Sequence, residues 1–166
     1  MALILHSLFP HRDVVAFHDR GYPPSTGRPS AQALFSDSLV IFDHSTRASV
    51  GGPILPVGFS IGAAVASTRS RRWPATGGLR SAPLLCNRMP TIEFVRGSNV
   101  PTAIIIAERD TIVPKPHSDA LSAEIENLVF ERAIDAGHND LYDHPAFAKA
   151  AREALMRVEA TSGESS

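Results

Sequence analysis

Residues Val57–Ala66 read VGFSIGAAVA and place a serine between two glycines. The apolar residues before Gly58 favour a strand, and the alanine-rich residues after Gly62 favour a helix. Gly58–Gly62 therefore matches G-x-S-x-G, a strained strand-to-helix turn that exposes a serine hydroxyl and needs small flanking residues to relieve crowding. The alternative is a plain glycine-bounded turn of a nucleotide-binding fold. The chain lacks the G-x-G-x-x-G and G-x-x-x-x-G-K-[ST] patterns typical of those folds.

Short apolar runs elsewhere in the chain predict further strands. Three β-branched runs, at residues 13–17, 53–57 and 102–107, are each followed by turn residues, and a more mixed run covers residues 128–134. Such runs are typical of strands that are buried on both faces of a parallel sheet. We therefore expect four strands, the last of them nearer an edge.

Helical patterns lie between these runs. Ser30 is expected to cap a helix that carries Leu34, Ser38 and Ile41 on one face, and Pro145 is expected to open the last helix. Alternating strands and helices predict an α/β fold in which helices flank a mostly parallel sheet.

The length of the chain, 166 residues, corresponds to one domain. We predict a single domain over residues 1–159. It contains an irregular segment at residues 69–101, which holds four prolines and no sustained periodicity. The small, polar residues 160–166 are expected to form a disordered tail.

Composition limits the class of partner and the compartment. Sixteen basic and 17 acidic side chains give a net charge of -1, so no basic surface for nucleic acid or an anionic membrane is expected. We expect no membrane-spanning run and no signal peptide at the N-terminus. Because Cys86 is the only cysteine, an internal disulfide is excluded and the cytoplasm is the default location.

A serine hydroxyl is a weak nucleophile unless a base takes its proton and an acid orients that base. Asp110 follows the apolar run at residues 102–107, and His138 follows the run at 128–134. The carboxyl ends of parallel strands meet at one edge of a sheet, and the order Ser, Asp, His is that of hydrolases with a G-x-S-x-G turn. Ser60 is thus the predicted nucleophile.

In this interpretation, Asp110 orients the base and His138 transfers the proton. Ile61 is expected to begin the helix after Ser60, and its backbone N–H would donate a hydrogen bond to the oxyanion. The plainer alternatives are an acidic turn at Asp110 and a surface-loop histidine at His138.

Two other chemistries are weaker. His138 and His144, with Asp140 and Asp143 between them, offer metal-ligand types, but six residues separate the histidines and no second cluster completes a shell. Cys86 has no neighbouring base motif and is expected to be an incidental thiol. We expect neither a metal nor a cofactor.

Four ordered segments resemble the α/β-hydrolase superfamily, and within it the serine aminopeptidase group and its Bem46-like relatives. They lie between about residues 8 and 158: FHDRGYPPSTGRPS at 17–30, GFSIG at 58–62, AERDTIVP at 107–114 and GHND at 137–140. The resemblance implies an α/β-hydrolase fold. It also implies that Ser60 is the nucleophile, Asp110 the acid and His138 the base.

The chain departs from the family pattern in three places, one of which is Asp19, where family members usually have an aromatic residue. Family members carry earlier strands and a loop that supplies a second oxyanion donor, and a cap region precedes the acid strand. The resemblance therefore implies a fold that lacks its first strands and oxyanion loop and is shortened in the cap. A sheet edge exposed by a missing strand would favour self-association.

The function that follows is a serine hydrolase, similar to carboxylesterases, that acts on a small-molecule ester or amide through an acyl-enzyme. The alternative is a catalytically inactive remnant, or a binding protein with the same fold.

Overall fold

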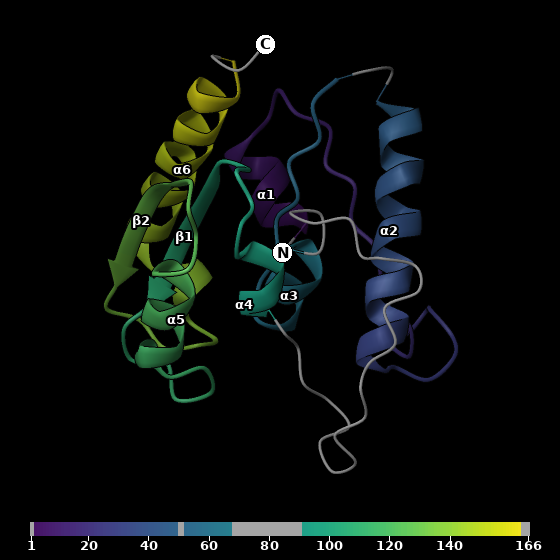
Figure 1. Ribbon diagram of the computed structural model, residues 1–166, viewed down its shortest axis with the longest axis horizontal. Helices are drawn as coiled ribbons and strands as arrows, with labels where there is room; N and C mark the ends of the chain where they lie inside the picture. The colour runs from purple at the N-terminus through teal and green to yellow at the C-terminus, as the bar shows by residue number, and fades with distance from the viewer. Residues whose placement is uncertain (1, 50–51, 68–90, 164–166) are drawn as a thin grey trace. The chain divides into compact units, whose positions relative to one another are not determined.

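The computed structural model describes residues 2–49, 52–67 and 91–163 (Figure 1). It divides into two compact units: unit 1 comprises Met1–Val14 and Arg96–Ser166, and unit 2 comprises Val15–Val95. That residues 1–159 form a single domain is still a prediction.

Unit 1 is built on a two-stranded parallel sheet. Strand β1 (Thr102–Ala107) pairs with β2 (Leu128–Ile134), and the register sets Ala107 opposite Ile134. Helix α5 (Lys115–Ser122) lies between them in the chain (Figure 1). Both apolar runs predicted as strands in this part of the sequence are confirmed, and the α/β class is confirmed with them.

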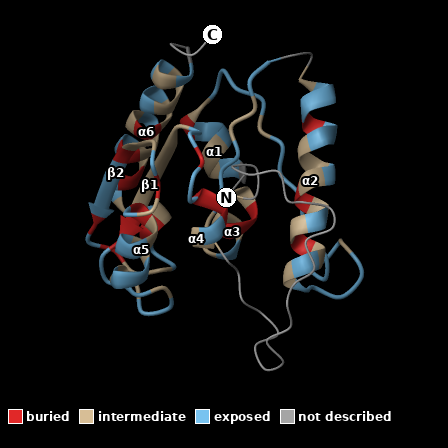
Figure 2. Ribbon diagram, in the orientation of Figure 1, coloured by how far each residue is buried: buried red, intermediate tan, exposed pale blue. Residues whose placement is uncertain are grey.

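Helix α6 (Pro145–Gly163) packs against both strands of unit 1. Phe147, Ala150 and Ala154 are its buried apolar residues, and exposed residues alternate with them along the helix (Figure 2). Helix α1 (Ala2–Leu8) also contacts α6. The predicted helix start at Pro145 is confirmed.

The expected disorder of the tail is wrong for residues 160–163, which belong to α6. The Thr161 and Ser162 hydroxyls donate hydrogen bonds to the carbonyls of Arg157 and Val158, one turn earlier. These bonds give the hydroxyl groups acceptors within the helix. The small, polar composition of residues 160–166 alone suggested a flexible tail. Residues 164–166 lie outside the described part of the chain.

Unit 2 consists of helices α2 (Ala31–Ala48), α3 (Ile61–Ser67) and α4 (Thr91–Val95). The Ser30 side chain accepts a hydrogen bond from the N–H of Ala33 at 3.2 Å and so caps α2 as predicted.

Helices α2 and α4 meet through the rings of Phe35 and Phe94, whose centroids are 4.9 Å apart in an edge-to-face arrangement. Helix α3 contacts both α2 and α4, and buried residues gather on α3 and α4 (Figure 2).

The predicted strands at residues 13–17 and 53–57 are not strands in the structure. Within the described ranges, the sheet contains only β1 and β2. Val15, Phe17 and Val57 are 61%, 47% and 61% exposed, because no paired strand or helix face covers them. The residues 53–57 also include two prolines, which cannot donate to a ladder.

In the described part of the expected irregular segment, residues 91–101, helix α4 covers Thr91–Val95. Residues 69–90 lie outside the described part of the chain. None of the described helices is both long enough and apolar enough to cross a bilayer.

Candidate active site

The backbone of Ser60 has a φ of 53°, and Ser60 is the one non-glycine among the described residues with a positive φ. Helix α3 begins at the next residue. The Gly62 N–H donates to the carbonyl of Phe59 at 2.8 Å, and the Ala63 N–H donates to that of Ser60 at 3.0 Å. A left-handed residue with a side chain costs about 1–2 kcal/mol, and such strain concentrates at functional sites. Ser60 therefore lies on a strained turn, as G-x-S-x-G predicts.

The two glycines beside Ser60 differ in what they tolerate. A Cβ at Gly58 would lie 2.1 Å from the carbonyl oxygen of Gly62 and 2.3 Å from its carbonyl carbon. A Cβ at Gly62 would meet no atom within 4 Å. Crowding therefore requires glycine at position 58, whereas Gly62 is not needed for this turn.

Backbone hydrogen bonds extend the alignment of β1 and β2 beyond their last residues. The N–H of Glu108 donates to the carbonyl of Ile134, and the N–H of Arg109 donates to that of Ala136, each at 2.9 Å. Ala136 is completely buried. The loops that leave the two strands therefore start side by side.

These loops bring Asp110 and His138 into direct contact. The Oδ2 atom of Asp110 lies 2.6 Å from Nδ1 of His138, and the two side chains are 9% and 10% exposed. The acid and the base predicted from the sequence are thus paired at the carboxyl edge of the β1–β2 sheet.

The second carboxylate oxygen of Asp110 is held by its own loop. Oδ1 accepts hydrogen bonds from the N–H groups of Ile112 at 2.8 Å and Val113 at 2.7 Å. Burial raises the pKa of Asp110, but hydrogen bonds from His138, Val113 and Ile112, with the charge of His138, outweigh burial and lower that pKa below its ordinary value. Asp110 is therefore ionised at neutral pH.

An ionised carboxylate only accepts hydrogen bonds, so the proton in the bond to Asp110 belongs to Nδ1 of His138. In the neutral imidazole, Nε2 is then the basic nitrogen. This is the tautomer that a general base needs when an acid orients it from behind.

The loop around His138 is packed closely. A Cβ at Gly137 would lie 2.8 Å from Oδ1 of Asp140, the end of a flexible side chain that could move aside. The loop continues into the short helix η2 (Leu141–Asp143), where the Tyr142 ring meets that of Phe147 edge-to-face at 5.2 Å. This contact attaches the loop to α6.

Sequence reasoning missed Arg109. Its Nε donates to Oδ1 of Asp135 at 2.5 Å, and its terminal nitrogen donates to the backbone carbonyl of Asp135 at 2.8 Å. The sequence does contain a signal for this ion pair. A basic residue, Arg109, follows the first strand directly before Asp110, and an acidic residue, Asp135, follows the second strand shortly before His138.

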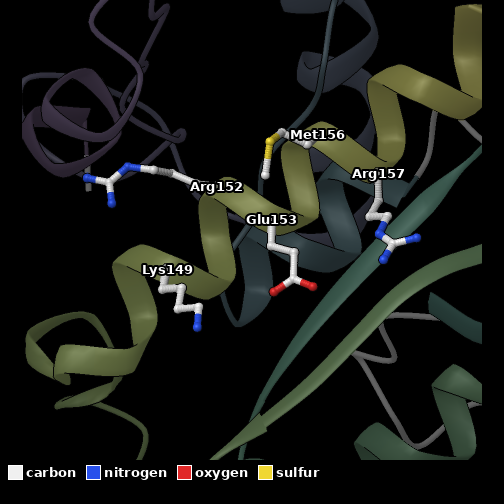
Figure 3. A pocket seen from close by; sticks show the side chains of 5 residues that line it. All are labelled: Lys149, Arg152, Glu153, Met156 and Arg157. Carbon is white, nitrogen blue, oxygen red and sulfur yellow. The ribbon is translucent and has the colours of Figure 1, made fainter.

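A surface pocket on α6 is separate from these residues (Figure 3). Glu153, at this pocket, forms an ion pair with Arg132 at 3.2 Å. The pocket contains no nucleophile paired with a base. Its lining residues are Lys149, Arg152, Glu153, Met156 and Arg157.

Metal-ligating side chains do not cluster in the described ranges: no group of three or more histidine, cysteine, aspartate or glutamate residues could hold an ion there. Cys86 lies outside these ranges.

The lowered pKa of Asp110 predicts an acid-dependent contribution to stability. Because the folded protein binds this proton less tightly than the unfolded chain, ionised Asp110 stabilises the fold above the ordinary pKa of 3.8. That stabilisation is lost as the pH falls through the lowered pKa. We expect the difference in free energy of unfolding between wild type and Asp110→Asn to shrink below about pH 4. Urea denaturation at several pH values measures it, and a difference independent of pH would contradict the assignment.

Comparison with known proteins gives two curated relatives. The uncharacterized proteins MT2364 and Rv2307c, from two strains of Mycobacterium tuberculosis, are each 32% identical to this chain over 162 residues. The alignment covers 84% of this chain and 57% of each relative, so the chain spans little more than half of their length. No family model matches the chain, and no solved structure matches it.

Proposed function

We propose that this chain is a serine hydrolase with an α/β-hydrolase-like fold, which acts on a small-molecule ester or amide through an acyl-enzyme. The observation that carries the proposal is the buried contact of 2.6 Å between Asp110 and His138 at the carboxyl edge of parallel strands. A carboxylate that fixes an imidazole tautomer is the arrangement that activates a hydroxyl nucleophile.

The proposed nucleophile is Ser60. Its positive φ, its position directly before α3 and the steric need for glycine at position 58 support this role. A serine in such a turn projects its hydroxyl away from neighbouring backbone. Other serines in the described ranges have ordinary backbone φ values, because Ser60 alone among the non-glycine residues there is left-handed.

The proposed reaction has two stages. Nε2 of His138 removes the hydroxyl proton as Oγ of Ser60 attacks the substrate carbonyl, and the imidazolium then protonates the leaving alcohol or amine. Water, activated by the same nitrogen, hydrolyses the acyl-enzyme and restores Ser60. Throughout, the Asp110 carboxylate stabilises the positive imidazole.

The N–H of Ile61 is the proposed donor to the oxyanion. Ile61 is the first residue of α3, and the first N–H groups of a helix have no carbonyl acceptor within the helix itself. The proposal includes no cofactor, and it keeps the cytoplasmic location predicted from the sequence. Self-association through an exposed sheet edge stays a prediction.

A non-enzymatic binding protein with the same fold is the second candidate. The exposure of Val15, Phe17 and Val57 favours it, because two runs of strand-forming residues lack sheet partners in the described structure. Such a protein would keep the Asp110–His138 contact without a reactive serine.

A serine-directed fluorophosphonate separates the two candidates. We expect wild type to be labelled and Ser60→Ala to lose labelling, because only an activated hydroxyl attacks phosphorus at a useful rate. Ser67→Ala is the matched control: Ser67 ends the same helix and its hydroxyl donates to the carbonyl of Ala64 at 2.7 Å. Equal labelling of wild type and Ser60→Ala would refute the proposal.

A further inference from the structure

We propose that Arg109 is a positioning residue that holds the loop carrying Asp110 against the loop carrying His138. Its effect on catalysis rests on the proposed function. The loop contacts themselves do not depend on that function, because they belong to unit 1 alone.

Three hydrogen bonds join Arg109 to the chain just after β2. Its backbone N–H donates to the carbonyl of Ala136 at 2.9 Å. Its side chain donates from Nε to Oδ1 of Asp135 at 2.5 Å and from the terminal nitrogen to the Asp135 carbonyl at 2.8 Å. The planar guanidinium thus donates hydrogen bonds to both the side chain and the backbone of Asp135, a geometry that lysine cannot reproduce fully.

These bonds act at the right place to set the distance between acid and base. Arg109 directly precedes Asp110, and Asp135 lies three residues before His138. The backbone carbonyl of Arg109 also faces Gly137, since a Cβ there would lie 3.9 Å from it. Sliding one loop past the other would therefore have to break these bonds of Arg109 as well as the contact between Asp110 and His138.

The ion pair between Arg109 and Asp135 is not expected to contribute much to the free energy of unfolding. The Arg109 and Asp135 side chains are 64% and 72% exposed, and ion pairs in such surroundings contribute little to folding. In contrast, the Asp110–His138 contact that they flank is buried and short. The larger consequence of these bonds is geometric, because they fix the position of Asp110 relative to His138. Misplacement of a catalytic group by about 1 Å can cost two orders of magnitude in reaction rate.

The test compares Arg109→Met with wild type by two measurements. Histidine NMR follows the exchange with solvent of the proton on Nδ1 of His138, and the fluorophosphonate labelling rate follows the reactivity of Ser60. We expect proton exchange to accelerate and labelling to slow by about tenfold to a hundredfold. Arg109→Lys should restore part of both, because lysine keeps the charge and can donate to Asp135 but lacks the planar arrangement of donors.

Arg96→Met is the matched control. It removes another exposed ion pair of unit 1, between Arg96 and Glu124 at 2.8 Å, which joins other segments. We expect it to leave both measurements at wild-type values. Asp135→Ala is the second variant: it removes the ion pair but keeps the carbonyl acceptor, so a smaller change in the same direction is expected.

The outcomes separate this proposal from the proposed function. Unlabelled wild type, with faster proton exchange in Arg109→Met, would refute the hydrolase and support the positioning role. Labelled wild type, with both measurements unchanged in folded Arg109→Met and Asp135→Ala, would overturn the positioning role and leave the hydrolase standing.

Discussion

Replacing Asp110 with asparagine should slow the reaction of Ser60 by about four orders of magnitude while the chain still folds. The hydrogen bonds around Asp110 explain why the effect is so large. Oδ1 accepts from the N–H groups of Ile112 and Val113, so the amide oxygen of the asparagine would take this position. The amide NH₂ would then face Nδ1 of His138, where Oδ2 now lies.

This substitution reverses the tautomer of the base. Because the amide donates, Nδ1 must accept, and the single proton of neutral His138 moves to Nε2. In the proposed reaction, that nitrogen could then not remove a proton from Ser60. Fluorophosphonate labelling measures the rate, and histidine ¹⁵N NMR measures the tautomer.

Asp119→Asn is the control for the asparagine substitution, since Asp119 forms an exposed ion pair with Lys115 on α5 at 2.7 Å. It should keep the wild-type labelling rate. If Asp110→Asn reacts at more than about a tenth of the wild-type rate, His138 is not oriented by Asp110 in the manner described.

The second large effect is expected at Gly58. A methyl group there would overlap the backbone of Gly62, with a closest approach of 2.1 Å, and no flexible side chain is available to move aside. We expect Gly58→Ala to lower the free energy of unfolding by about 3 kcal/mol, or to distort the turn and abolish labelling at Ser60. Urea denaturation, read alongside labelling, measures both.

Gly62→Ala is the matched control for Gly58→Ala. Its Cβ would meet nothing within 4 Å, and position 62 lies in α3, where alanine is favoured over glycine by about 0.5–1 kcal/mol. We expect this variant to be as stable as wild type or more stable. Equal destabilisation by the two substitutions would contradict the described geometry of the turn.

The two glycines also show where sequence reasoning stops. The pattern G-x-S-x-G treats positions 58 and 62 alike, and only the path of the backbone distinguishes them. Similarly, the ends of β1 and β2 predicted that Asp110 and His138 would meet. They could not predict the bonds from Ile112 and Val113, which depend on the conformation of a loop.

Two of the four predicted strands form and two do not, for a physical reason. Residues 102–107 and 128–134 form β1 and β2 as expected, since they pair with each other and are covered by α6. The runs at 13–17 and 53–57 have similar local composition but no sheet partner in the described structure. A run of β-branched residues records local preference, whereas strand formation also requires a partner.

The central claim is that Ser60 is a nucleophile activated by His138. The most direct test is to locate the fluorophosphonate adduct by peptide mass spectrometry, in wild type and in His138→Gln. The account predicts an adduct on Ser60 in folded wild type and a loss of at least about a thousandfold in its rate of formation in His138→Gln. An adduct on a different serine, no adduct at all, or equal modification of Ser60 in both proteins would contradict it.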